Sequence, residues 1–91
     1  MDRKMSNVFV DRENKWGLDV DEISGRMFVN IPVANRMADY LEWYELDRET
    51  FERFRADPQS AEAREFVAKA KNRDLDHLLL LKPGADRGWP I

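Results

Sequence analysis

Apolar and polar residues alternate with a period of two over the first third of the chain, residues 6–31. Residues 8–10 begin the pattern, residues 16–21 repeat it, and residues 27–31 repeat it again. Such alternation is typical of strands with one buried and one exposed face. Short polar turns separate the three segments, and short connections join antiparallel neighbours. We therefore predict a three-stranded antiparallel meander over 6–31, with Trp16 in the core.

The period becomes helical after Pro32, which ends the third strand because proline has no N–H to donate to a sheet. The spacing predicts three helices over 34–73. The first would place one apolar stripe at positions i, i+3, i+4 and i+7. That stripe consists of Met37, Tyr40, Leu41 and Tyr44.

Two capping patterns mark the second and third helices. Asp47 can accept the free N–H groups of a helix that starts behind it, and Leu46 and Phe51 occupy the two positions of a hydrophobic staple. Asp57 followed by Pro58 predicts the start of the third helix. One face of that helix would carry Ala63, Phe66, Val67 and Ala70.

A short apolar run over 77–81 is bounded by the turn residues Pro83 and Gly84. A run of this length favours a buried strand, although periodicity alone does not separate a strand from a helix. We predict that a fourth strand over 76–82 returns to the sheet. The expected fold class is α+β, with a single domain over 1–84 and a C-terminal tail over 85–91.

Length, charge and composition limit the classes of protein to which the chain can belong. The 91 residues suffice for one hydrophobic core, and 15 basic against 18 acidic residues give a net charge of −3. A dedicated nucleic-acid binder usually carries a strongly basic face instead. The apolar stretches fall short of the roughly 20 residues that cross a bilayer, and the N-terminus lacks the apolar segment of an export signal. We therefore expect a cytoplasmic protein that does not contact membranes.

The sequence does not favour a metal or cofactor site. With no cysteine and one histidine, the chain cannot build a thiolate or histidine-cluster zinc site. The acidic segment 19–22 departs from a calcium-binding EF-hand loop, because Ile23, Ser24 and Asn30 stand where that loop needs other residues. We interpret the segment as the exposed face of the second strand.

An enzyme is the alternative to a binding protein. The only histidine, His77, would act as the general base, with Asp74 or Asp76 or carboxylates of the helices beside it. Neighbouring residues of a strand point to opposite faces, however, so Asp76 would orient His77 poorly. The sequence contains no G-x-S-x-G, P-loop or H-E-x-x-H motif, and we assign no catalytic residues.

Nucleic-acid binding is a second alternative. It would use basic residues of the second and third helices, although glutamates interleave with them in the pattern of solvated helix ion pairs. These basic residues are Arg48, Arg53, Arg55, Lys69, Lys71 and Arg73.

Aromatic residues give the leading hypothesis. Trp43 would lie away from the centre of the first helix's apolar stripe, covered by a neighbouring element or exposed to a partner, and Trp89 in the tail raises the same question. Tryptophan and tyrosine are enriched at binding hot spots. We therefore predict a non-catalytic protein-interaction module, an adaptor, inhibitor or regulatory subunit that binds a protein partner or a second copy of itself. The expected contact residues are Tyr40, Trp43, Tyr44 and Trp89.

Overall fold

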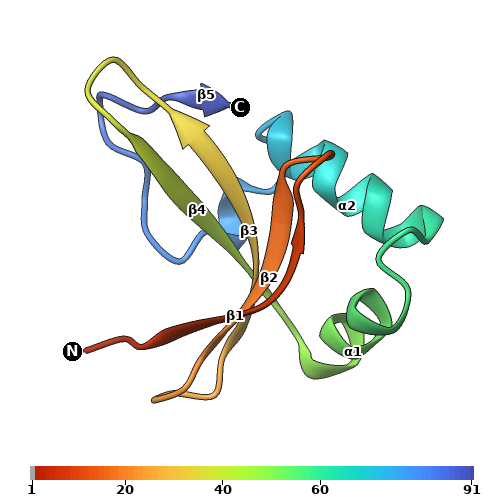
Figure 1. Ribbon diagram of the computed structural model, residues 1–91. Coiled ribbons are helices and arrows are strands. Elements are labelled where there is room, and N and C mark those ends of the chain that lie inside the picture. The colour runs from red at the N-terminus through yellow and green to blue at the C-terminus, as the bar shows by residue number, and fades with distance from the viewer. Residues whose placement is uncertain (1) are drawn as a thin grey trace.

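The first half of the chain forms an antiparallel sheet in the computed structural model, which describes residues 2–91 (Figure 1). The strands β1 (Met5–Asp11), β2 (Trp16–Asp21), β3 (Met27–Ala34) and β4 (Asp39–Leu46) pair in the order in which they occur. A two-residue strand, β5 (Trp89–Pro90), pairs with the far end of β3.

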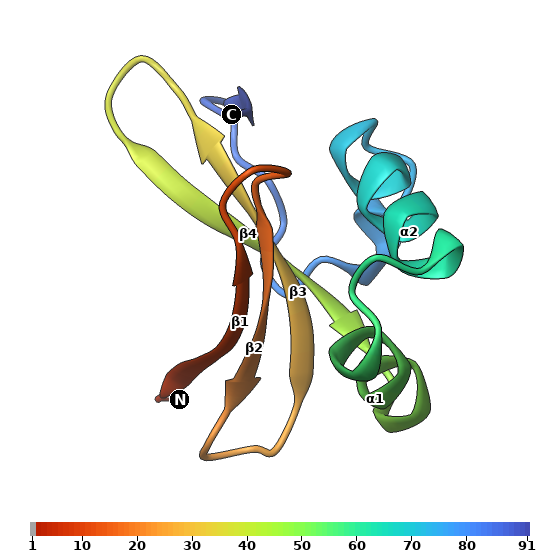
Figure 2. The same ribbon diagram turned by 45° about the vertical axis from the view of Figure 1, so that its right-hand side comes forward.

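The second half supplies two helices, α1 (Arg48–Ala56) and α2 (Ala61–Lys71), followed by the short 3₁₀ helix η1 (Asp76–Leu78). Figure 2 shows α1 and α2 on the same side of the sheet. The predicted α+β class is therefore confirmed. Within residues 2–91, no helix combines the length and the apolar character needed to cross a bilayer.

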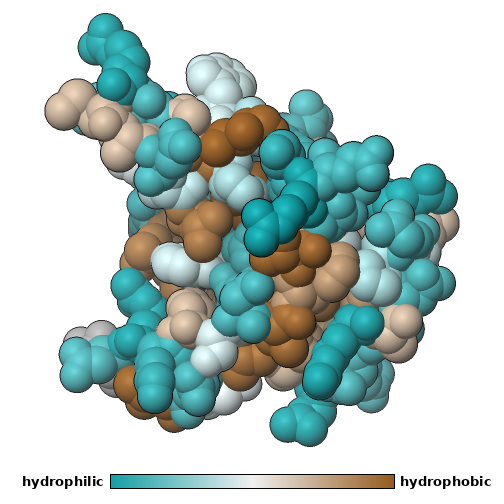
Figure 3. All heavy atoms as spheres, in the orientation of Figure 1, coloured by the Kyte–Doolittle hydropathy of each residue, from teal (hydrophilic) through white to brown (hydrophobic). Residues whose placement is uncertain are grey.

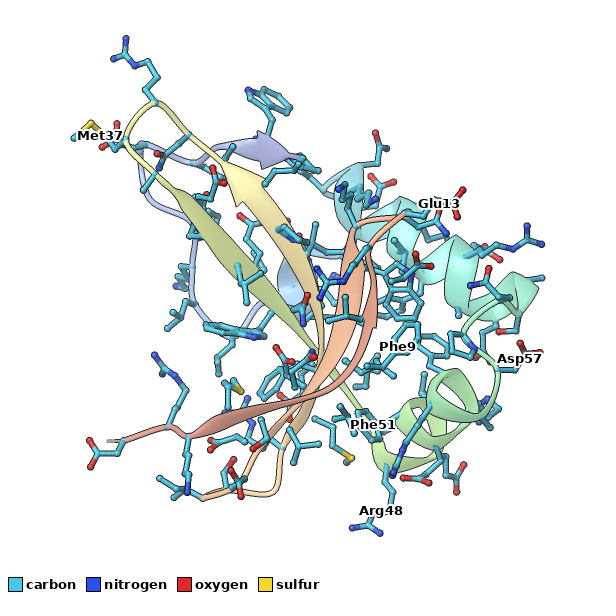
Figure 4. The ribbon with its side chains drawn as sticks, viewed as in Figure 1. Phe9, Glu13, Met37, Arg48, Phe51 and Asp57 are labelled. Carbon is cyan, nitrogen blue, oxygen red and sulfur yellow. The ribbon has the colours of Figure 1, made fainter. Side chains whose placement is uncertain are left out.

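The core fills the space between the sheet and the helices. Alternate residues of the strands point toward this side and meet Phe51 (labelled in Figure 4) and Phe54 of α1 and Ala63, Val67 and Ala70 of α2. Phe66 is half-buried, with its ring centroid 5.5 Å from that of Phe54. The apolar face predicted for the last helix is thus confirmed. The strands contribute Trp16, Leu18, Val29, Ile31, Val33, Tyr44 and Leu46 to this core.

The helix predicted before Leu46 is wrong, because Asp39–Leu46 is strand β4. The apolar residues of this segment fit both a helix and a strand. In a helix they form the stripe that ends at Tyr44, and in a strand Tyr40, Tyr44 and Leu46 lie on one face. Strand formation pairs eight residues of β3 with β4 and buries Tyr44 and Leu46 in the core. Aromatic residues also favour strands, so long-range pairing selects the second period.

The prediction of three helices is therefore also wrong, and one boundary moves. The Asp47 cap is confirmed, since its carboxylate accepts the Thr50 N–H at 2.7 Å. Asp57, however, closes α1 rather than opening the next helix. Helix α2 begins three residues later, where Ser60 Oγ accepts the Ala63 N–H at 3.1 Å.

The strand predicted over 76–82 is wrong as well. Residues Asp76–Leu78 form η1, and one isolated bridge between Leu79 and Tyr44 replaces a strand pairing. Leu75 and Leu78 pack against the core from the turn, so the apolar run is half-buried without being extended. Leucine lacks the branched Cβ that favours strands, which allows this outcome.

The segment expected as a tail is hydrogen-bonded to the sheet. Trp89 and Pro90 pair with Ala34 and Val33, and the Ile91 N–H donates to Pro32 at 3.1 Å. Strand β3 continues beyond Asn30, its last residue paired with β2, and β5 pairs with Val33 and Ala34 at the end of this stretch.

Candidate functional site

The face of the sheet opposite the helices, here called the open face, carries a hollow of about 650 Å³. Its walls are mainly apolar, and two cations, Arg12 and Lys15, stand at its rim. On the side seen in Figure 3, hydrophobic side chains gather over the middle of the molecule, with hydrophilic side chains around them. The apolar wall consists of Met5, Val10, Pro32, Leu41, Trp43 and Ile91.

The floor of the hollow is polar and centres on Asp19, which is only 3% exposed. Its Oδ1 accepts the Asn7 amide at 2.9 Å, and its Oδ2 accepts the Asn30 amide at 2.9 Å and the Trp43 indole N–H at 2.8 Å. Each of the four strands of the meander contributes one member. The network can position side chains of the floor because, within residues 2–91, no buried side-chain nitrogen or oxygen lacks a hydrogen-bond partner.

Strand register explains why these four residues meet. Asn7 lies opposite Asp19, and Asn30 lies opposite Trp43. Gly17 lies opposite Asn30, and a Cβ there would come within 2.9 Å of the Asn30 amide and 2.5 Å of the Phe9 carbonyl oxygen. A glycine is therefore required beside the floor for steric reasons.

Next to Asp19, the open face carries the buried aromatic ring of Phe28. Phe28 lies opposite Asp19 and Glu45 and is fully buried. The Arg26 guanidinium covers its ring at 5.6 Å from the centroid and pairs with Glu45 at 2.6 Å. Hydrogen bonds from Arg26 lower the pKa of the Glu45 carboxyl. This ion pair therefore covers Phe28 on the open face.

The acidic segment of the second strand was interpreted as exposed, which is wrong for two of its residues. Asp19 and Asp21 are buried, whereas Glu22 is exposed. Asp21 accepts the backbone N–H groups of Lys4 at 3.0 Å and of Ile23 at 3.1 Å. The Lys4 hydrogen bond is the main reason that the pKa of Asp21 is lowered. Asp21 therefore caps the β2–β3 turn.

The four predicted contact residues do not form one surface. Tyr44 is fully buried, and Tyr40 packs against the same core while its hydroxyl accepts the Gly88 N–H at 2.9 Å. Trp43 is half-buried and lines the hollow on the opposite face. Trp89 is 69% exposed on β5, with the Arg73 guanidinium 3.9 Å from its ring centroid. Of the four, the hollow includes Trp43 alone.

Sequence reasoning missed the polar floor. Asn30 gave a signal, because it is a polar residue between the apolar positions Val29 and Ile31 of a predicted strand. The signal could not be used without the pairing of β3 with β4, which brings Trp43 beside it.

A second polar cluster joins the C-terminal segment to the sheet. Arg87 donates to Glu42 at 2.8 Å and to Asp76 at 2.8 Å, and the Tyr44 hydroxyl donates to Glu42 at 3.0 Å. Hydrogen bonds to Asp76 and Glu42 raise the pKa of Arg87, and the hydrogen bond from Arg87 lowers the pKa of Asp76. Burial, followed by the Glu42 charge, raises the pKa of Tyr44. The ion pairs of Arg87 with Glu42 and Asp76 join the C-terminal segment to β4 and η1, so the cluster acts as a clamp.

The two aspartates considered beside His77 for the enzyme alternative have other hydrogen-bond partners. His77 is exposed on η1, while Asp76 is bound to Arg87 and Asp74 accepts a hydrogen bond from Asn72. In the part of the chain described, residues 2–91, histidine, aspartate and glutamate side chains do not gather in a group of three that could hold a metal ion.

The basic residues proposed for nucleic acid are largely engaged within the molecule. Arg53 pairs with Glu62 at 2.9 Å and Lys69 with Glu65 at 3.1 Å. Lys71 donates to the Asn14 carbonyl, and Arg73 donates to the Gly88 carbonyl. Arg48 and Arg55 are exposed.

Comparisons of the chain with known protein families, curated proteins and solved structures found no match.

Proposed function

We propose that this protein is a non-catalytic interaction module that binds a protein segment on the open face, with an apolar side chain of the partner in the hollow. The single observation that carries the proposal is the hollow of about 650 Å³, whose mainly apolar wall surrounds the Asp19 floor. Binding sites characteristically combine apolar walls with a few fixed polar groups.

Exposed apolar side chains support this surface. Val10 is 48%, Leu41 40% and Ile91 50% exposed, and all three line the hollow. Scattered exposed apolar residues need no explanation, whereas a contiguous group marks an interaction site. Trp43 adds an aromatic side chain held rigidly by its hydrogen bond to Asp19, and such anchors dominate binding energies.

The charged residues beside the hollow indicate the charge that a partner would carry. Arg12 and Lys15 are exposed beside the hollow, and neither forms an ion pair within residues 2–91. A carboxylate on the partner would meet both cations, which favours association and orients the segment. The proposed ligand is therefore a peptide segment with a large apolar side chain next to an acidic residue.

Selection from a displayed random-peptide library tests this ligand chemistry. Peptides selected by the protein should be enriched in an apolar residue adjacent to Asp or Glu. Their binding should fall at least about tenfold in Leu41→Asp, because a charge would enter the apolar wall. Ile23→Asp is the matched control, since Ile23 is 58% exposed on the β2–β3 turn, away from the hollow.

Backbone NMR shifts locate the bound peptide. The perturbed amides should cluster on β1, β3 and β4 around the hollow. Equal binding to wild type and Leu41→Asp, or perturbations confined to α1 and α2, would show that the open face is not the binding surface.

A further inference from the structure

The outer edge of β1 has no strand partner within residues 2–91. At the opposite edge of the sheet, Tyr44 of β4 forms an isolated bridge with Leu79, and the Trp43 backbone carbonyl accepts the Leu80 N–H at 2.9 Å. The free end of β3 is covered by β5. An open strand edge presents backbone donors and acceptors to another strand. The residues of β1 from Met5 to Val10 carry no charge that would oppose pairing.

Two hydrogen bonds show which residues of β1 face outward. The Lys4 carbonyl accepts the Glu22 N–H at 2.9 Å, so Lys4 faces β2 and, by alternation, Met5 and Asn7 face away. At the other end the Asp11 carbonyl accepts the Lys15 N–H at 2.9 Å, so Val10 faces away. A register shift between Asn7 and Phe9 accounts for this change from odd to even positions.

We propose that two copies of this chain pair through β1 in antiparallel fashion, with Met5 of each copy opposite Val10 of the other. This register joins Met5 to Val10, both of which face outward, as ladder hydrogen bonds require. It also keeps side chains on matching faces, because Met5 and Val10 both line the hollow.

Charge complementarity favours the same register. It places Lys4 of each copy opposite Asp11 of the other, giving two oppositely charged cross-strand pairs. The next positions outward would oppose Arg3 and Arg12, which carry like charges. The ladder therefore stops before Arg3 and Arg12, and its length is close to that of β1.

The pairing would build one sheet of eight strands, four from each copy. A two-fold axis perpendicular to the sheet keeps both open faces on the same side. The two hollows then adjoin along their Met5 and Val10 walls, so that each copy extends the site of the other. This last consequence rests on the proposed function, whereas the pairing itself does not.

Disulfide trapping tests the register, because the chain has no native cysteine. Hydrogen-bonded antiparallel partners have Cα atoms about 5.5 Å apart, which a disulfide can span. Under mild oxidation, Met5→Cys mixed with Val10→Cys should yield a linked dimer of twice 10.8 kDa. Met5→Cys mixed with Ile23→Cys is the control and should remain largely unlinked.

Sedimentation of the wild-type chain and of Val10→Pro completes the test. Proline removes an N–H that faces away from β2, so the fold should persist, as circular dichroism would check, while the dimer is lost. A wild-type monomer at about 200 µM, or trapping no greater than in the Ile23→Cys control, would overturn the proposal. Trapping without peptide binding would leave the pairing standing and reject the proposed function alone.

Discussion

Asp19 is a buried carboxylate whose hydrogen bonds come from neutral side chains of three neighbouring strands. Hydrogen bonds to a charged group stabilise more than those between neutral groups, and losing the acceptor would leave buried donors unpaired. The residue therefore contributes to stability and to the shape of the hollow together. Its position between the walls also keeps Trp43 in one orientation.

Asp19→Ala should lower the free energy of unfolding by about 2–4 kcal/mol, because three donors lose their acceptor. Urea denaturation measures this change. Asp39→Ala is the matched control: Asp39 is exposed at the start of β4, and its substitution should change the free energy by less than about 0.5 kcal/mol. Equal stability of Asp19→Ala and wild type would mean that the floor is not held by this network.

Strand β4 is the incorrectly predicted element that matters most for the site, because a helix was expected in its place. The first three strands and both helices were predictable, because their periodicity and the Asp47 cap act locally. Tyr40, Leu41 and Tyr44 fit a helix as well as a strand, so the choice depended on pairing with β3. Predicting a helix separated Trp43 from Asp19 and Asn30, and the hollow could not be inferred.

The C-terminal segment is a further element that depends on distant contacts. Gly88 lies against β3, where an added Cβ would come within 2.1 Å of the Ala34 carbonyl oxygen. The clamp of Arg87 with Glu42 and Asp76 fixes the residue just before it. Sequence patterns gave the turn residues of this segment but not the surface that receives it.

Gly88→Ala should release β5 from β3, because the methyl group and the Ala34 carbonyl cannot occupy the same space. Hydrogen exchange at the Ile91 N–H, which donates to Pro32, should become markedly faster. Gly84→Ala provides the control, since a Cβ there meets nothing within 4 Å. Unchanged exchange at Ile91 in Gly88→Ala would contradict the docking of the segment.

The two faces of the sheet differ in how they are covered. Helices α1 and α2 bury the face that carries Leu18, Val29 and Tyr44. The open face keeps exposed apolar side chains around a satisfied polar floor, an arrangement that costs solubility unless a partner covers it. The stability of the folded state at acid pH depends on local ion pairs and helix caps.

Acid should destabilise the whole fold in a defined pH range. The pKa values of several carboxyls are lowered in the folded state by hydrogen bonds: to Arg26 for Glu45, to Arg53 for Glu62, and to Arg87 for Asp76. Their contribution is therefore complete above the ordinary values of 4.5 for Glu and 3.8 for Asp. It is lost as the pH falls below these values through the folded-state pKa of each group, because the unfolded chain binds protons first.

Urea midpoints measured from neutral pH to about pH 2.5 should stay nearly constant and then fall steeply below about pH 4.5. Arg26→Met should reduce the slope of this fall, since the pKa of Glu45 would return toward its ordinary value once the guanidinium is gone. Lys82→Met removes an exposed cation outside these pairs and serves as the control for net charge. A stability that is independent of pH between about 5 and 2.5 would show that these carboxyls titrate alike in the folded and unfolded chains.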